Sequence, residues 1–421
     1  MNQKSFTLIE ILIVIVIIGI LSALILVAIN SIVDSTQDAK RKKDLDSISK
    51  SLMEYGTITG SYPVEAFECN IGDGTCLNEL IDTGYAKNFP LDPSGARYKY
   101  TSDGTTYTIS TTISNGSRLA YSPDNGFKEN SYEWTARDAA EATSWGSVAY
   151  GNGIFVAIAR GGTHQVMTSP DGITWTARDA AEFANWMDIA YGNGIFVAIN
   201  NYNFDGTHRV MTSTDGIYWE ARDIPELNNW QSITYGNGLF VAVSYDGTHR
   251  VMTSPDGISW TAQTAAEAKG WQSITYGNGL FVAVAYGGVM TSTDGTYWEA
   301  RDALETGGNY WYFVAYGNGV FVASSYIAPT VTMTSPDGIT WTARDVPVGS
   351  GFGWRSITYS NGLFVAVSDN NTYRVMTSPD GITWTARDAA EVNGWQSVTY
   401  GNGLFVAVAS SGTHRVMTWE Y

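Results

Sequence analysis

Cysteine, histidine and, in the C-terminal part, lysine are scarce in this 421-residue sequence. It contains two cysteines and four histidines, and Lys269 is the only lysine after residue 130. Neither a metal-ligand spacing nor a Ser–His pairing for nucleophilic catalysis occurs. The net charge of −17 predicts an acidic surface that repels nucleic acid and anionic lipid, which excludes both as partners of the C-terminal part.

Polar side chains are almost absent from Ile11 to Ile29, where Ser22 is the only one. A helix of this length rises about 28 Å, close to the thickness of the bilayer hydrocarbon. The leader before Phe6 is too short for a secretory signal peptide. Glu10 stands at the start of the apolar run, where a carboxylate is costly unless it has a partner and a task. We therefore predict a membrane span at residues 6–29.

The N-terminal residues Lys4-Ser5-Phe6-Thr7-Leu8-Ile9-Glu10, followed by the apolar helix, resemble the type IV pilin family, including the pseudopilins of type II secretion. The resemblance implies that prepilin peptidase cuts between Ser5 and Phe6 and that Phe6 is then methylated. It also implies that Glu10 meets the terminal amine of a neighbouring pilin subunit, so that two buried charges offset each other on assembly. Ser5 departs from the family pattern, in which the residue before the cleavage site is usually Gly. The alternative is a plain signal anchor in which Glu10 is incidental.

The remainder of the N-terminal part is predicted to be a helix and a small head. Residues 1–5 are the leader. Further along, Leu45, Ile48 and Leu52 recur at helical spacing. This pattern places the pilin helix at 6–56, with 6–29 in the membrane or filament core. Residues 57–125 combine strand and turn patterns, typical of a small α+β pilin head. The polar, turn-rich residues 126–131 are predicted to be a linker.

Cys69 and Cys76 lie in the head on either side of a Gly-rich loop. An exported chain allows a disulfide here, worth about 2–3 kcal/mol by the entropy of closing so short a loop. Metal binding would need further Cys or His nearby. The head also resembles that of major pseudopilins, some of which hold calcium. Asp92 and Asp103 are the candidate ligands, although turn formation is the commoner role of such residues, and no cofactor is assigned.

A repeat with a period of 40–44 residues fills the rest of the chain. One tryptophan series opens each unit, at Trp145, Trp186, Trp230, Trp271, Trp311, Trp354 and Trp395, and a second lies in segments such as Ser-Pro-Asp-Gly-Ile-Thr-Trp, at Trp134, Trp175, Trp219, Trp260, Trp298, Trp341 and Trp384. Four strand-like runs per unit at this period are typical of propeller blades. The second segment resembles the Asp-box (BNR-like) propellers related to sialidases, with one residue fewer between Asp and Gly.

The order of the two tryptophan series predicts how the ring closes. Tyr132–Arg137, an outermost strand, precedes the first opening strand, whereas the chain ends on a third strand, Arg415–Trp419. We therefore expect residues 132–421 to form an all-β, seven-bladed propeller whose last blade takes its outer strand from the N-terminal side. Closure removes exposed sheet edges.

The repeated residues argue against chemistry. An Arg–Asp dipeptide recurs at one place of five units (Arg178-Asp179, Arg222-Asp223, Arg301-Asp302, Arg344-Asp345 and Arg387-Asp388), and we interpret it as a structural ion pair, because a catalytic site needs unlike groups at one point. The four histidines, His164, His208, His249 and His414, also share one place. A hydrogen-bonding or packing role is expected for them, and a pH-sensitive or metal-binding ring is the alternative.

Loops on one side of the ring vary among the units, whereas the Gly-Asn-Gly and Pro-Asp-Gly turns on the other side do not. Loops on a rigid scaffold are where binding usually resides, so the candidate ligand residues are those of the variable loops, namely Tyr202, Phe204, Tyr310, Tyr326, Phe352 and Asn370. We expect a non-enzymatic pilin-like surface subunit whose propeller binds an extracellular glycan or protein. The alternatives are a surface-anchored, sialidase-like glycan-processing enzyme and a minor pseudopilin that primes a secretion filament.

Overall fold

The computed structural model describes residue 33 and residues 36–420, except 73–75, 96, 103, 113–117, 124–125, 131–132, 202–207, 305–309, 326–330, 347–352 and 371. The chain forms two compact units, Met1–Tyr132 and Glu133–Tyr421. The span predicted at residues 6–29 lies outside the described residues. Among the helices that are described, none is both long and apolar enough to cross a membrane.

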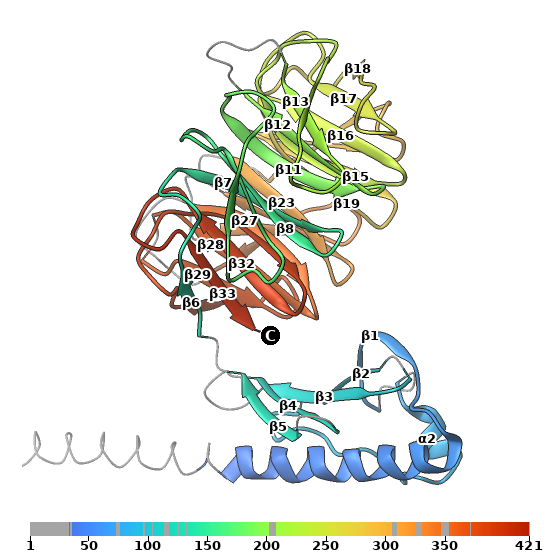
Figure 1. Cartoon of the computed structure of the whole chain (residues 1–421). Helices are drawn as coiled ribbons and strands as arrows, with labels where there is room; N and C mark the ends of the chain where they lie inside the picture. Colours follow the sequence, from blue (N-terminus) through green and yellow to red (C-terminus); the bar gives the residue numbers. More distant parts are fainter. Residues whose placement is uncertain are drawn as a thin grey trace, which may run out of the picture. The chain divides into compact units, whose positions relative to one another are not determined.

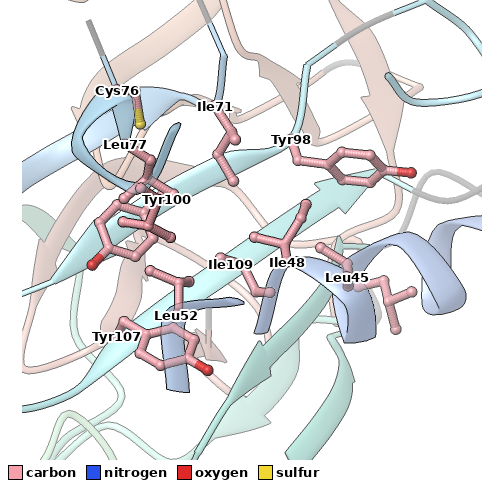
Figure 2. Close-up of a cluster of buried hydrophobic side chains, with 12 residues drawn as sticks. Leu45, Ile48, Leu52, Ile71, Cys76, Leu77, Tyr98, Tyr100, Tyr107 and Ile109 are labelled. Carbon is pink, nitrogen blue, oxygen red and sulfur yellow. The ribbon is translucent and has the colours of Figure 1, made fainter. Parts of the chain in front are cut away.

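A helix over residues 36–59 packs on the sheet of the first unit. Leu45, Ile48 and Leu52 are at most 1% exposed, and Figure 2 shows them beside Tyr100, Tyr107 and Ile109 of the sheet. Their spacing puts all three on one helix face, as predicted. The helix runs three residues past the predicted end at residue 56 and stops before Gly60, whose φ of +81° ends the helical path.

The sheet of the first unit has five strands in chain order. They are β1 (Glu65–Asn70), β2 (Lys99–Ser102), β3 (Tyr107–Thr112), β4 (Arg118–Ser122) and β5 (Gly126–Asn130), and the short helix α2 (Asn78–Asp82) follows β1. The predicted linker is wrong over residues 126–130, which form β5 and pair with β4. Backbone hydrogen bonds on an edge strand need no apolar side chains, so the polar sequence concealed the strand.

The second unit consists of seven four-stranded antiparallel sheets, the blades (Figure 1). Blade 1 has β7 (Trp145–Gly151), β8 (Ile154–Ala159), β9 (Val166–Ser169) and β10 (Thr176–Arg178); blade 2 has β11 (Trp186–Gly192), β12 (Ile195–Asn200), β13 (Val210–Ser213) and β14 (Glu220–Arg222); blade 3 has β15 (Trp230–Gly236), β16 (Leu239–Ser244), β17 (Val251–Ser254) and β18 (Thr261–Gln263). Blade 4 has β19 (Trp271–Gly277), β20 (Leu280–Ala285), β21 (Gly288–Ser292) and β22 (Glu299–Arg301); blade 5 has β23 (Trp311–Gly317), β24 (Val320–Ser325), β25 (Val331–Ser335) and β26 (Thr342–Asp345). Blade 6 has β27 (Trp354–Ser360), β28 (Leu363–Ser368), β29 (Val375–Ser378) and β30 (Thr385–Arg387), and blade 7 has β31 (Trp395–Gly401), β32 (Leu404–Ala409), β33 (Val416–Glu420) and β6 (Thr135–Arg137).

The ring closes as the tryptophan order predicts. In blade 7, β33 pairs antiparallel with β6 from the N-terminal side, and β31 packs against β7 of the first blade. A second contact recurs at six of the seven junctions: the Tyr150 ring lies where a Cβ on Gly401 would stand, 2.1 Å from a ring atom, and Tyr191 lies likewise over Gly151. Blade 6 has Ser360 at the equivalent place, whereas at the six glycines an added side chain would collide with the tyrosine ring.

Two local turns shape every blade. Each first hairpin turns at an Asn with φ near +50° followed by a Gly with positive φ, as in Asn152 and Gly153, which suits the twist of paired strands. Between the third and fourth strands of the first six blades, an aspartate closes the turn: Asp171 Oδ1 accepts the N–H groups of Ile173 and Thr174, at 2.9 and 2.8 Å. Both turns lie on one side of the ring, because the Asn152 side chain donates to the carbonyl of Thr214 in the next blade.

Candidate functional site

A channel runs through the centre of the ring, between the first strands of the blades. These strands, β7, β11, β15, β19, β23, β27 and β31, each pack against their counterparts in both neighbouring blades. The channel holds a cavity of about 300 Å³, lined mostly by residues near the start of these strands and by Arg160, which follows β8. The cavity therefore belongs to the side of the variable loops, opposite the Asn-Gly and Asp-Gly turns.

Side chains inside the channel join neighbouring blades. The hydroxyls of four serines accept backbone N–H groups from the following blade at 3.2–3.4 Å. The pairs are Ser232 with Ile274, Ser273 with Val314, Ser356 with Val398, and Ser397 with Val148. Because each bond spans two blades, this belt of serines holds the channel at a defined width.

Asp188 takes the serine's place in blade 2. Its carboxylate accepts the N–H groups of Ile189 and Ile233 and the hydroxyls of Ser147 and Ser232, all at 2.9–3.0 Å. It thus ties three blades together. Desolvation inside the ring outweighs these four hydrogen bonds and raises the pKa of Asp188 above its ordinary value.

Arg160 lies at the end of the channel on the side of the variable loops. We call this end the channel mouth; it is lined by Gly146, Arg160, Tyr312 and Arg355. A Cβ on Gly146 would lie 3.2 Å from Arg160 Nε, and the other six blades carry larger residues at this place (Met187, Gln231, Gln272, Tyr312, Arg355 and Gln396). Among the described residues Arg160 Nε is buried without a hydrogen-bond partner. Burial lowers the pKa of Arg160, and the charge of Arg355 acts in the same direction.

The second arginine of the channel mouth has a carboxylate partner. Arg355 contacts Asp369 Oδ2 through Nη2 at 2.5 Å and Nε at 2.7 Å, and its guanidinium carbon lies 5.3 Å from the centre of the Tyr312 ring. Asp369 follows β28 as Arg160 follows β8, and its charge also attracts Arg160 and Arg374. The mouth thus combines the guanidinium groups of Arg160 and Arg355 with the carboxylate of Asp369, and Asp188 lines the same cavity.

Apolar side chains are exposed on loops of the same side of the ring as the mouth. Tyr286 and Tyr310 are 55% and 41% exposed, and their ring centres lie 4.3 Å apart. Phe183, Leu227 and Val392, on the connections between blades, are 57%, 61% and 82% exposed. We call these five residues the apolar rim. Exposed apolar groups beside a polar cavity are typical of a binding face.

Two of the six predicted ligand residues are described. Tyr310 belongs to the apolar rim, and Asn370 is exposed beside Asp369. Tyr202, Phe204, Tyr326 and Phe352 lie outside the described residues. The groups that converge at the mouth, Arg160, Arg355 and Asp369, were not predicted. They are departures from the repeat, so a comparison of equivalent positions among the seven units was the signal that would have found them.

The histidines have the hydrogen-bonding role predicted for them. His208 contacts Glu182 through Nδ1 at 2.5 Å and Asp223 through Nε2 at 3.3 Å, and His414 contacts Glu391 and Asp138 at 2.6 and 3.6 Å. His164 contacts the carboxylates at the equivalent positions of its own blade, Glu141 and Asp179. His249 contacts Glu226. The hydrogen bonds to Glu141 and Glu391 raise the pKa values of His164 and His414.

The recurring Arg–Asp dipeptide is not the ion pair that its sequence suggested. Arg178 Nε donates to the Thr168 hydroxyl of the neighbouring strand at 3.1 Å, and the same bond recurs for Arg222, Arg301, Arg344 and Arg387. Asp179 instead lies beside His164. Successive residues of a strand point to opposite faces, so adjacent Arg and Asp are poorly placed to pair.

The first unit holds the remaining predicted residues. Cys69 and Cys76 form a disulfide with Cα atoms 5.7 Å apart. Asp92, a candidate calcium ligand, instead accepts hydrogen bonds from Arg41 Nε and Thr111 Oγ1, each at 2.8 Å, and the other candidate, Asp103, is outside the described residues. No group of three potential metal ligands occurs in the described part of the chain.

The residues predicted for processing and assembly, Ser5, Phe6 and Glu10, also lie outside the described residues. Residues 1–26 match the family model of the prokaryotic N-terminal methylation motif.

Two curated proteins are similar to the N-terminal part. Type II secretion system core protein G of Pseudomonas aeruginosa is 34% identical over 109 residues, which cover 25% of this chain and 77% of that protein. The protein of the same name from Aeromonas hydrophila is 30% identical over 108 residues, covering 24% of this chain and 76% of that protein.

Solved structures resemble the propeller in fold. Virginiamycin B lyase from Staphylococcus aureus has a TM-score of 0.59 at 10% identity and covers 68% of this chain and 98% of its own. A streptogramin B lyase has a TM-score of 0.58 at 11% identity, covering 68% and 96%, and U3-55K has 0.53 at 7%, covering 69% and 99%. Identities this low establish the shared fold alone.

Proposed function

Because this chain belongs, through its N-terminal quarter, to the family of type II secretion system core protein G, we propose that it is a pilin-like subunit that displays its propeller at the cell surface for binding. Prepilin peptidase removes residues 1–5 at the inner membrane and Phe6 becomes the methylated N-terminus. Glu10 then meets the terminal amine of a neighbouring pilin subunit, and the subunits stack into a filament.

The observation that carries the binding role is the loop-side face of the propeller. A polar cavity of about 300 Å³ is at the lower end of the size of ligand sites, and the apolar rim lies on loops of the same side of the ring. The ligand is an extracellular glycan or protein, bound without chemistry. The helix and small α+β head of the first unit hold this face outside the membrane.

Processing and assembly are tested on the full-length protein expressed in a bacterium with a type II secretion system. Mass spectrometry should find a mature N-terminus at methylated Phe6, and an antibody to the propeller should label sheared filaments. A Ser5→Gly variant, which restores the usual family residue, should be processed at least as fast. A Glu10→Val variant should be processed but absent from filaments. Uncut protein free in the cytosol would overturn the proposal.

Binding is tested by the adhesion of cells or filaments to glycan and protein surfaces. Tyr286→Ala with Tyr310→Ala should abolish adhesion, because both rings are exposed on the loop-side face. The matched control is Tyr218→Ala with Tyr297→Ala, two even more exposed tyrosines in turns on the opposite side. Equal adhesion by both double variants would count against the loop-side face.

A second candidate function is supported by the mouth itself. Arg160, Arg355, Asp369 and Tyr312 are unlike groups that converge from two strand ends and two inner strands, which is the arrangement that an enzyme site requires. Under this alternative the propeller processes glycans. Incubation with acidic and neutral oligosaccharides separates the two functions, because only an enzyme releases shortened products.

A further inference from the structure

The channel mouth holds a guanidinium N–H group that no acceptor among the described residues satisfies. Arg160 Nε is buried and unpartnered, and Arg355 already uses the nearby carboxylate of Asp369. A buried N–H group of a charged side chain without an acceptor is costly. We propose that the channel mouth binds the carboxylate of an acidic sugar, a uronate unit of an extracellular polysaccharide, through Arg160. This inference rests on the propeller being the binding unit proposed above.

The space for the carboxylate comes from one departure in the repeat. Only blade 1 has a glycine at the first lining position, and the Arg160 side chain lies over it, with Nε 3.2 Å from the place of a Cβ. A side chain at Gly146 would crowd the guanidinium. Arginine suits the task because its planar N–H groups match a carboxylate edge to edge.

The rest of the cavity favours a sugar over other carboxylates. Its walls include Gln231, Gln272 and Gln396, whose amides complement hydroxyl groups, and about 300 Å³ accommodates a single sugar ring. The paired rings of Tyr286 and Tyr310 at the rim offer apolar faces for the next sugar along the chain. The net charge of −17 opposes non-specific binding of acidic polymers, so their binding requires a specific site such as this one.

The test is calorimetric titration of the detergent-solubilised full chain with a galacturonic acid trisaccharide. The neutral galactose trisaccharide, acetate and a peptide with a free C-terminal carboxylate are titrated in parallel. Arg160→Gln and Gly146→Met, which copies the residue of blade 2, should each weaken galacturonate binding at least tenfold. The control Arg178→Gln should leave it unchanged, because Gln263 holds the equivalent place in blade 3 and makes the same hydrogen bond to a threonine. Thermal unfolding checks that every variant is folded.

Several results would overturn the inference. These are unchanged galacturonate binding by Arg160→Gln, equal affinity for the neutral trisaccharide or for acetate, preference for the peptide, and no galacturonate binding at all. The proposed function fails separately. If the Tyr286 and Tyr310 double variant loses adhesion but the wild type does not bind uronate, the proposed function stands and this inference is wrong. If the wild type binds uronate but never enters filaments, this inference stands and the proposed function is wrong.

Discussion

Arg137 Nε donates to the hydroxyl of Thr418 at 3.1 Å, and this bond joins the two ends of the propeller. It is the bond that Arg178 and Thr168 make within blade 1. The closing blade, assembled from both ends of the unit, therefore repeats the internal detail of a continuous blade. Closure depends on the same strand pairing as the rest of the ring, and Arg415 adds a hydrogen bond from Nη1 to the carbonyl of Thr143 at 2.6 Å.

The closing bond predicts a graded effect of substitutions at Arg137. Arg137→Ala should lower the free energy of unfolding of the propeller by about 0.5–1.5 kcal/mol, the usual worth of one such hydrogen bond. Arg137→Gln should cost less, because Gln263 makes the equivalent bond at 3.1 Å in blade 3. Denaturant unfolding followed by tryptophan fluorescence measures both, and an identical loss in the two variants would contradict the role of the bond.

Asp188 should be replaceable by serine but not by alanine. Alanine leaves the N–H groups of Ile189 and Ile233 without their acceptor, at about 1–3 kcal/mol for each group left buried and unpaired. Serine restores the residue found in blades 1, 3, 4, 6 and 7, whose hydroxyl can accept an N–H from the next blade. We expect Asp188→Ser to be clearly more stable than Asp188→Ala in thermal unfolding.

The same residue predicts a pH dependence. Desolvation raises the pKa of Asp188 in the folded state above its unfolded value, so the folded state binds the proton more tightly. The contribution of Asp188 to stability is therefore fully present below the ordinary Asp pKa and is lost as the pH rises through the raised value. Comparing unfolding curves of the wild type and Asp188→Ser across this range should show the loss in the wild type alone.

The disulfide should stabilise the first unit only. Replacing Cys69 and Cys76 together by alanine should lower the stability of that unit by about 2–3 kcal/mol, from the loop entropy restored to the unfolded chain. The propeller has no cysteine, so its unfolding transition should stay where it is. Calorimetry with and without a reductant resolves the two transitions, and a shift of both would show that the units are coupled.

His414 should titrate above the ordinary histidine range. The hydrogen bond that its imidazole donates to the Glu391 carboxylate raises its pKa, with Asp138 adding attraction. Its stabilising contribution is present below the unfolded pKa of a histidine and is lost as the pH rises through the raised value. NMR of histidine-labelled protein should show the raised pKa, and Glu391→Gln should lower it. A pKa that Glu391→Gln leaves unchanged would assign the shift to another cause.

Local patterns were sufficient to predict the blades. The Asn-Gly and Asp-Gly turns and the two tryptophan series act over a few residues, so their geometry is written in the adjacent sequence. Even the closing strand followed from the order of the two series. The prediction failed where the local pattern is weak: residues 126–130 are polar and turn-rich, yet they complete the sheet of the first unit as β5, because pairing with β4 supplies backbone hydrogen bonds.

By itself, the sequence determined that an apolar, acid-bearing N-terminus precedes a ring of repeated sheets, because periodicity and short motifs report local structure. Only the tertiary structure decided what the ring encloses. Arg160 of blade 1 and the pair Arg355 and Asp369 of blade 6 are far apart in the chain, and closure of the ring brings them to one channel mouth. A property that depends on closure has no local signature, since no short stretch of sequence contains both sides of the channel.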